Sequence, residues 1–316
     1  MFSCINIFFN RHKTLLGFLT VILFVILLLL FIFKEDLLVQ SRIPKFYLSN
    51  QTLSQCKDSY NKHFPDEFRN TTIRGSSFDL SIPGNTKEAF MVAGTDLIKY
   101  AEADFMLSSD NILVSIHNEN IGRKCAPVRQ RTFIELQKCA FGNEWHLATL
   151  VEFLRQPFRE VYVDLKDTLS LDKILALRSV NAAIKSIKQT GRRDSAIIMI
   201  YNITPEIIDL IKENHIRAGL KGYPCSKKET MTLVKVAACY GFELVCVPLS
   251  QVSARIIKDS ADMGVWHLDW YIDKPNIFFW RSLIKEGLGG IISPYYRLVE
   301  EQASSYWQNL QKSSGK

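Results

Sequence analysis

Short runs of β-branched and aromatic residues alternate with amphipathic stretches from about residue 71 onward. Two such runs, EVYVDLK at 160–166 and SAIIMIY at 195–201, are separated by a helical pattern from Leu169 to about Gly191. Repeated strand–helix units imply parallel strands with helices packed outside them. Counting TIRGSS (72–77) and YAEADFML (100–107) as the first two strands, the units approach eight over about 245 residues, the usual size of a (β/α)8 barrel. The alternation therefore predicts an α/β fold, a TIM barrel.

An open doubly wound sheet is the alternative, but the Gly-rich turn G-x-G-x-x-G that usually follows its first strand is absent from the sequence. The 316 residues, 47% of them hydrophobic, suffice for a large domain with its own core. The net charge of +7 is spread along the chain rather than clustered. We therefore expect no nucleic-acid partner.

The N-terminal region contains twenty consecutive uncharged residues, TLLGFLTVILFVILLLLFIF at 14–33, enough to cross a bilayer as a helix. Arg11 and Lys13 precede this run and favour a cytoplasmic N-terminus. A cleaved signal peptide is the alternative, but the apolar run is longer than an h-region and no A-x-A pattern follows it. We expect a cytoplasmic tail (1–13), a transmembrane signal anchor (14–33), a stalk (34–70) and an extracytoplasmic barrel (71–316), in a lumenal, extracellular or periplasmic space.

The cysteines fit this orientation. Cys4 would lie on the cytoplasmic side, and an even number would lie in an oxidising compartment, where some can pair. These six are Cys56, Cys125, Cys139, Cys225, Cys239 and Cys246. A zinc site is not expected because no C-x-x-C occurs. Asn50, Asn70 and Asn202 each begin a sequon and would accept glycans if they are exposed.

Acidic residues lie two apart on one expected strand. Glu102 and Asp104 in YAEADFML (100–107) share a strand face, and Asp164 and Lys166 are spaced in the same way in EVYVDLK. In a TIM barrel the C-terminal ends of the strands carry the chemistry. The three carboxylates would form an oxygen cage for Mg²⁺ or Ca²⁺. Lys166 would bind an anionic substrate group or act as a counter-ion for Asp164.

Several segments, in order and approximate spacing, resemble the glycerophosphodiester phosphodiesterase family over roughly residues 71–300. They are IRGSS…PGNTKEAF, EADF…DNILVSIHNENIGR, TFIELQK, LATLVEFL, VYVDLK and WYID…LIKEGLGGIISPYY. The resemblance implies a TIM barrel that hydrolyses phosphodiesters with a divalent cation and two histidines.

Residue by residue, the resemblance makes Glu102, Asp104 and Asp164 the metal ligands and His117 the second histidine, with Asn118 in place of the usual Asp. With His117, the catalytic candidates are Arg74 and Lys166. Arg74 could instead pair with a carboxylate at the barrel mouth, and His117 alone could be structural.

Besides Asn118, the sequence departs from the family at three positions. Ile73 stands where the first histidine should be, and Gly84 replaces the Glu of the family's Pro-Glu-Asn-Thr. Asp164 stands where the family usually has Glu, although sphingomyelinase-D-like barrels of the same superfamily have Asp there, followed by Leu-Lys. Isoleucine cannot transfer a proton, and His267, on the expected seventh strand, is the remaining candidate for the missing imidazole.

Two functions follow from the sequence. The first is a membrane-anchored, metal-dependent phosphodiesterase of weak or altered activity, acting on glycerophosphodiesters or lysophospholipid-like ligands. The second is an inactive barrel that binds a phosphodiester or a protein partner. A menorin-type barrel is a weaker fit, because IRGSS…PGNT is more similar to the phosphodiesterases. The sequence predicts no oligomeric state.

Overall fold

The structure is a computed structural model that describes residues 65–75, 81–96, 98–119, 127–139, 144–170, 172–270 and 277–313. All of these belong to one compact unit, residues 44–316. The expected tail, the expected anchor and most of the expected stalk lie outside the described residues. Within the described ranges, no helix is long and apolar enough to cross a membrane.

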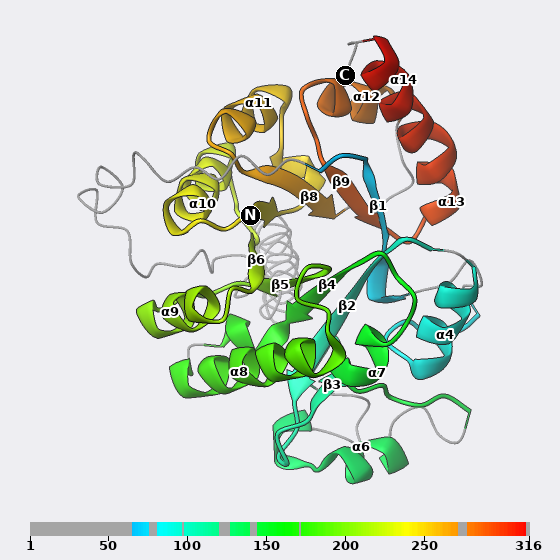
Figure 1. Ribbon diagram of the computed structural model, residues 1–316, viewed down its shortest axis with the longest axis vertical. Coiled ribbons are helices and arrows are strands. Elements are labelled where there is room, and N and C mark those ends of the chain that lie inside the picture. Colours follow the sequence, from blue (N-terminus) through cyan, green and yellow to red (C-terminus); the bar gives the residue numbers. More distant parts are fainter. Residues whose placement is uncertain are drawn as a thin grey trace, which may run out of the picture. The chain divides into compact units, whose positions relative to one another are not determined.

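Parallel strands close into a barrel, as the alternation predicted (Figure 1). Around the barrel the order is β1, β9, β8, β7, β6, β5, β4, β2, and pairing of β1 with β2 completes the circle. The ninth strand, β3 (Leu113–Ser115), pairs antiparallel with the end of β2. The barrel strands are β1 (Arg69–Thr72), β2 (Tyr100–Leu107), β4 (Glu160–Leu165), β5 (Ala196–Ile200), β6 (Arg217–Lys221), β7 (Leu244–Cys246), β8 (Trp266–Trp270) and β9 (Gly290–Ser293).

Helices form the outer layer around the strands (Figure 1). They are α4 (Lys87–Thr95), α6 (Phe133–Cys139), α7 (Leu150–Leu154), α8 (Lys173–Thr190), α9 (Pro205–Glu213), α10 (Lys227–Tyr240), α11 (Ala254–Asp262), α12 (Ile277–Lys285), α13 (Tyr296–Val299) and α14 (Ser305–Ser313), with a π-helical segment, Glu300–Ser304, between the last two. Many begin at a side chain that accepts a hydrogen bond from a backbone N–H of the first turn, which satisfies one of the helix's free donors. These caps are Thr86, Thr149, Asp172, Thr204, Ser226 and Ser253.

The strand period of two divides the core into two regions. One set of strand side chains packs against the helices, for example Ala103, Val163 and Ile198. The other set forms a separate cluster inside the barrel, which includes Tyr162 and Met199. Because Glu102, Asp104 and Asp164 alternate with members of the outer set, they lie on the inner face.

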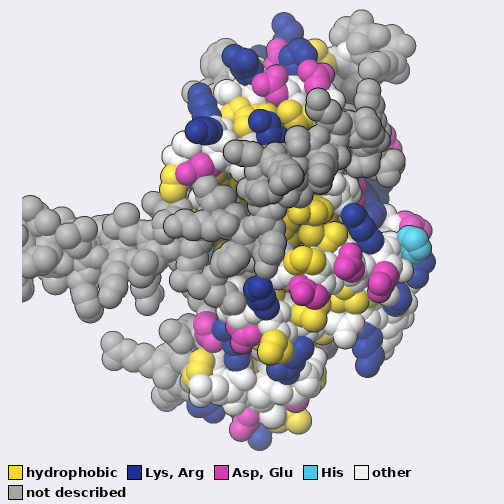
Figure 2. Space-filling view, turned by 90° about the vertical axis from the view of Figure 1, so that its left-hand side faces the viewer, with side chains coloured by type: hydrophobic (Ala, Val, Ile, Leu, Met, Phe, Trp, Pro, Cys, Tyr) yellow, Lys and Arg dark blue, Asp and Glu magenta, His cyan; other side chains and the backbone are white. Residues whose placement is uncertain are grey.

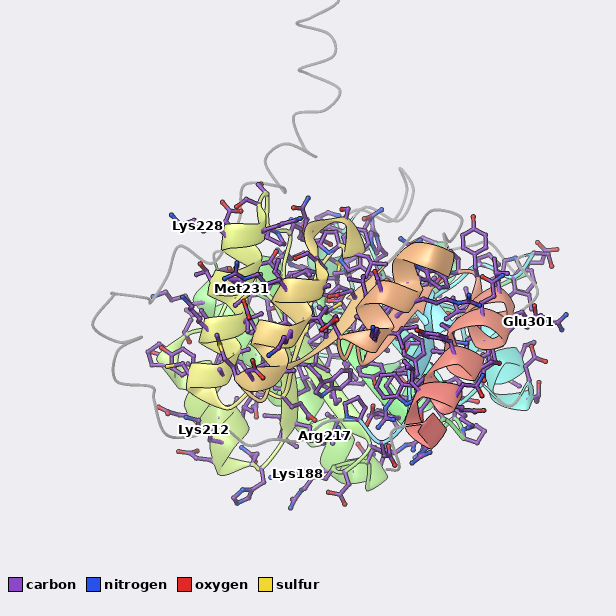
Figure 3. The ribbon with its side chains drawn as sticks, turned by 90° about the horizontal axis from the view of Figure 1, so that it is seen from above. Lys188, Lys212, Arg217, Lys228, Met231 and Glu301 are labelled. Carbon is purple, nitrogen blue, oxygen red and sulfur yellow. The ribbon has the colours of Figure 1, made fainter. Side chains whose placement is uncertain are left out.

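Helix direction shows which end of the barrel carries the carboxyl ends of the strands. In Figure 3, Lys228 in the first turn of α10 lies at the opposite end from Lys188 near the end of α8, Lys212 near the end of α9, and Arg217, which opens β6. Since each of these helices starts where a strand has ended, the Lys228 end is the mouth. The Arg217 end is the base.

The first strand differs from its prediction. TIRGSS was expected to be a strand, but β1 ends at Thr72 and a tight turn, Ile73–Gly75, follows it. Arg74 has a φ of +54°, which no strand residue adopts. The strand also begins at Arg69, inside the expected stalk, and Phe68 belongs to the outer core.

Two of the three sequons are described, and their asparagine side chains are engaged. Asn70 is 1% exposed, and its amide nitrogen donates to Glu300 Oε2 at 2.8 Å. Asn202 donates to the carbonyl of Leu169 at 3.1 Å. The sequence predicted glycans only at exposed asparagines, a condition that the buried Asn70 does not meet, and Asn50 lies outside the described residues.

Of the described cysteines, Cys139 and Cys239 are disulfide-bonded, whereas Cys246 is a buried free thiol. Some pairing was expected from the even number of cysteines. Charges of both signs interleave on the face that Figure 2 shows, where lysines and arginines alternate with acidic side chains among the described residues.

Candidate active site

Three carboxylates gather at the mouth of the barrel. Asp104 and Asp164 are direct neighbours in the register of β2 and β4, and Glu102 lies two residues before Asp104 on the same inner face. One oxygen from each of the three residues lies within 4.8 Å of the others, and each residue is at most 2% exposed. The predicted convergence of these acids at one rim is thus present.

Two lysine ammonium groups neutralise these acids. Lys166 Nζ lies 2.8 Å from Asp104 Oδ1 and 2.7 Å from Asp164 Oδ2. Lys221 Nζ, from the end of β6, lies 2.9 Å from Glu102 Oε1 and 2.5 Å from Asp164 Oδ2. Lys166 was expected at the site from the sequence, but Lys221 was missed; its signal was a lone lysine at the carboxyl end of the run RAGLKGY.

The pKa values follow from burial and these ion pairs. Burial opposes the ionisation of Asp104, but Lys166 and His117 outweigh it and hold the pKa of Asp104 well below its usual value. For Glu102, burial exceeds the effect of Lys221 and raises the pKa. Burial would lower the pKa of each lysine, yet the neighbouring carboxylates raise both, so Lys166 and Lys221 are charged at neutral pH.

Asn85 fixes Asp104 with two hydrogen bonds. Its Nδ2 donates to Asp104 Oδ2 at 2.8 Å, and its Oδ1 accepts from the backbone N–H of Asp104 at 3.1 Å. Asn85 itself has a φ of +61°, which asparagine tolerates better than most residues. It is one of the residues of PGNT that matched the family, and the next, Thr86, caps α4.

Arg74 approaches the same acids from the turn after β1. Its backbone N–H donates to Glu102 Oε2 at 3.0 Å, and its Nε lies 3.6 Å from Asp104 Oδ2. The side chain is 43% exposed, so part of the guanidinium faces solvent at the mouth. Arg74 therefore pairs with a carboxylate at the mouth, which was the alternative to a catalytic role in the sequence analysis. Its exposed part can still reach an anionic ligand.

His117 follows β3 and lies in the electrostatic field of Asp104, Lys166 and Arg74. Its Nδ1 is 2.7 Å from Asn118 Oδ1, an oxygen that can only accept, so Nδ1 carries the proton and Nε2 keeps a lone pair. Burial lowers the pKa of His117 despite the opposing effect of Asp104. The imidazole is therefore neutral at pH 7.

Arg129 anchors the loop that carries His117. Its Nε lies 3.2 Å from Asp167 Oδ1 and 3.6 Å from Glu119 Oε1. The neighbouring residue, Val128, donates its backbone N–H to the carbonyl of Glu119 at 3.1 Å. Asp167 also accepts from the N–H of Leu107 at the end of β2. The His117 loop is thus tied to the strand that bears Glu102 and Asp104.

His267 does not reach the site, which overturns its candidacy as the missing imidazole. In β8 the side chains of Trp266 and Leu268 belong to the inner cluster, so His267 lies on the outer face. There its Nε2 is 2.9 Å from Ser260 Oγ in α11, and its Nδ1 is 3.1 Å from Asp269 Oδ2. Ile73, in contrast, packs against the inner cluster.

An aromatic wall flanks the charged cluster. Tyr201 donates to Asp164 Oδ2 at 2.9 Å and accepts from Lys166 at 3.1 Å. Tyr223 stacks on Tyr201 with ring centroids 5.8 Å apart, and its edge contacts Trp270. The indole N–H of Trp270 is buried and has no hydrogen-bond partner in the described part of the chain, so it is a donor that a ligand oxygen could satisfy.

The donor set of the three acids suits a hard divalent cation, because every candidate ligand is a carboxylate oxygen. Among the described residues, Asp164 Oδ1 is a buried oxygen without a hydrogen-bond partner, which a purely structural core rarely leaves. The triad could therefore hold a metal ion through Glu102, Asp104 and Asp164. The other oxygens of these acids already contact protein donors.

At the level of sequence, no protein-family model matches the chain, and no curated protein matches it. Solved structures do. A glycerophosphodiester phosphodiesterase from Parabacteroides distasonis ATCC 8503 is 17% identical, with a TM-score of 0.58 over 79% of this chain and 100% of that one. The Thermotoga maritima glycerophosphodiester phosphodiesterase is 18% identical, with a TM-score of 0.56 over 76% and 99%.

An Oleispira antarctica phosphodiesterase, in complex with the product sn-glycerol-3-phosphate, is also 18% identical, with a TM-score of 0.60 over 76% of this chain and 97% of that one. These alignments cover almost the whole of each solved chain. The resemblance inferred from the ordered motifs is thus confirmed in three dimensions: this chain has the barrel fold of the glycerophosphodiester phosphodiesterases.

Proposed function

We propose that this protein is a phosphodiesterase of low turnover that acts on glycerophosphodiesters or lysophospholipid-like ligands. The observation that carries the proposal is the meeting of Glu102, Asp104, Asp164 and the neutral imidazole of His117 at one barrel mouth. The fold is shared with phosphodiesterases, one of which is described with sn-glycerol-3-phosphate.

The side chains have distinct roles in this proposal. His117 accepts a proton at Nε2 from the attacking hydroxyl or water, because Nδ1–H is held by Asn118. The half-exposed guanidinium of Arg74 binds a phosphate oxygen. Lys166, fixed between two carboxylates, contributes positive charge and does not transfer a proton.

Glu102, Asp104 and Asp164 would hold a divalent cation, Mg²⁺ or Ca²⁺. When bound, such an ion stabilises the charge that develops on the phosphoryl oxygens. Ile73 stands where a second proton-transferring group would be expected, and it packs among apolar side chains. Loss of one general acid or base typically slows a reaction by about 10² to 10⁴, which is why we propose low turnover.

The proposed setting is a membrane surface on the extracytoplasmic side. It is supported by the uncharged run at 14–33 and by the basic residues Arg11 and Lys13 before it. A helix formed by that run would hold the barrel near lipid headgroups, which contain the phosphodiester bonds in question. Protease protection of the barrel in sealed vesicles, with digestion after detergent, would test this orientation.

Hydrolysis of glycerophosphocholine by the full chain in detergent tests the activity. We expect slow, Mg²⁺- or Ca²⁺-dependent release of choline that His117→Ala abolishes. His146→Ala is the matched control, because His146 is exposed and its imidazole contacts Glu88 at the surface. Equal turnover in the wild type and His117→Ala would contradict the proposal.

The second candidate is a barrel that binds a phosphodiester without cleaving it. Ile73 at the position of the missing histidine favours it. In that case sn-glycerol 3-phosphate would bind, Arg74→Ala would weaken binding at least tenfold, and no choline would appear at any metal concentration.

A further inference from the structure

The carboxylate cluster includes a lysine ammonium group, that of Lys221, at a position that the family resemblance does not account for. Lys221 comes from β6, across the barrel from Glu102 on β2, yet its Nζ contacts Glu102 Oε1 and Asp164 Oδ2 at 2.9 and 2.5 Å. The lysine is only 6% exposed. It therefore lies between two of the three carboxylates that could hold a metal ion.

We propose that Lys221 is a resident counter-ion that competes with divalent cations for the carboxylate cluster. A metal ion bound to Glu102 and Asp164 would lie beside the Lys221 ammonium, because that ammonium contacts one oxygen of each residue. The repulsion between such charges is strong in a buried site, where solvent screens them little. Divalent ions therefore bind weakly until Lys221 is displaced.

The distribution of hydrogen bonds supports this competition. Asp164 Oδ2 accepts from Lys166, Lys221 and Tyr201 together, whereas Asp164 Oδ1 accepts from no donor. Glu102 is held on its other oxygen by the backbone N–H of Arg74. An incoming ion would find one uncommitted carboxylate oxygen on Asp164, and its charge would meet two ammonium groups.

The two lysines are not equivalent in this respect. Lys166 pairs with Asp104 and Asp164 from the residue directly after β4, and it matched the family pattern. Lys221 pairs with Glu102, and the inner-facing residue before it on β6 is Gly219, which has no side chain. Removing Lys221 therefore frees Glu102 Oε1 and removes one of the three contacts of Asp164 Oδ2, but it leaves Lys166 paired with Asp104 and Asp164.

The inference rests on the carboxylate cluster of the proposed function, but its test requires no substrate. Mn²⁺ is titrated into the full chain in detergent, and free Mn²⁺ is followed by electron paramagnetic resonance, with Mg²⁺ as competitor. We expect millimolar half-saturation for the wild type. Lys221→Met, which keeps the volume of the side chain and removes its charge, should bind Mn²⁺ at least tenfold more tightly.

Two further variants locate the effect. Lys228→Met, an exposed lysine at the same end of the barrel, should bind as the wild type does. Adding Asp164→Asn to Lys221→Met should remove the gain, because Asp164 is shared by the ammonium and the ion. Micromolar binding of Mn²⁺ by the wild type would overturn the proposal, and this result does not depend on whether any variant folds. Unchanged Mn²⁺ binding by a folded Lys221→Met variant would also overturn it. Failure of the phosphodiesterase proposal would instead appear as absent turnover with this binding pattern intact.

Discussion

Single residues decide how the acids are held, and Asn85 has the largest positioning role. It is 4% exposed, and both ends of its amide group contact Asp104. Without Asn85, Asp104 Oδ2 would lose its 2.8 Å hydrogen bond and keep Arg74 Nε at 3.6 Å, while Lys166 would remain paired with Oδ1. Lys166 and His117 outweigh burial and lower the pKa of Asp104, and Asn85 Nδ2 adds a hydrogen bond to the carboxylate.

Asn85→Gly should therefore lower the free energy of unfolding by about 1 to 3 kcal/mol, the cost of leaving buried polar groups without partners. Glycine tolerates the positive φ of this position, so the variant removes the amide without straining the backbone. Urea denaturation measures the change. An unaltered midpoint would show that the two hydrogen bonds contribute nothing net.

The lowered pKa of His117 determines how kcat/KM should depend on pH. Because the base must be neutral, kcat/KM should rise with pH and level off, with a midpoint below the usual histidine value of 6.5. The hydrogen bond that His117 Nδ1–H donates to Asn118 Oδ1 raises the His117 pKa, so Asn118→Ala should move the midpoint lower still. A midpoint above 6.5 in a pH–rate profile would contradict this assignment.

At the scale of elements, the sequence predicted the strands and helices well because buried strands and amphipathic helices differ in period. The turn after β1 could not be predicted from the period of its residues. TIRGSS has strand-like composition, whereas Arg74 and Gly75 adopt positive φ values that the pattern does not encode. The prediction for His267 was wrong for a related reason: both faces of a barrel strand are buried, so the period of WHLDW did not show which face points inward.

Lys221 was missed for a topological reason. Its partner Glu102 is 119 residues away and lies on a strand that is not its neighbour in the sheet. Only closure of the barrel brings β2 and β6 to face each other. Glu102 and Asp104 could be paired with Asp164 from the sequence, since successive strands of a barrel are usually adjacent.

Gly75 makes the turn after β1 possible, and two glycine variants separate its requirements. A Cβ at Gly75 would lie 2.2 Å from the ring of Phe90, and Gly75 has a φ of +57°. Gly191, which ends α8, has a φ of +69°, but a Cβ added there would meet nothing within 4 Å. Gly191→Ala should cost about 1 kcal/mol through backbone strain alone. Gly75→Ala should lower the stability by more than this and should impair ligand binding by Arg74. Thermal denaturation measures both stability losses, and equal losses in the two variants would contradict the prediction.

At the scale of the whole molecule, the two ends of the barrel use charge differently. At the base, Glu160 accepts from Arg69 Nε at 3.2 Å and from Arg217 Nη1 at 2.7 Å, and Arg217 continues to Glu243. These opposite charges satisfy one another. At the mouth, Asp164 Oδ1 and the indole N–H of Trp270 have no hydrogen-bond partner among the described residues, which supports the proposal that a ligand binds at this end.

The base should determine much of the acid sensitivity of the fold. Burial would raise the pKa of Glu160, but Arg217, Tyr162 and Arg69 together lower it below the usual 4.5. A lowered folded-state pKa gives stability that is present above pH 4.5 and is lost as the pH falls through the folded-state value.

Glu160→Gln should therefore destabilise the protein at pH 7, by about 3 kcal/mol, and should lose less stability than the wild type on acidification. Urea denaturation at a series of pH values measures both effects. Asp262→Asn, which removes the exposed partner of Lys258, is the control and should change neither. Parallel pH dependence in Glu160→Gln and the wild type would rule out this role for the base.

The central claim is that the acids, His117 and Arg74 form a phosphodiesterase site that lacks one proton-transfer group at Ile73. The most direct test is the initial rate of glycerophosphocholine hydrolysis, followed by ³¹P NMR, for the wild type, Ile73→His and Ile73→His/His117→Ala. We predict that Ile73→His raises the slow wild-type rate at least about 100-fold and that the double variant loses this gain. An unchanged rate in folded Ile73→His, or a gain that survives the loss of His117, would contradict the account.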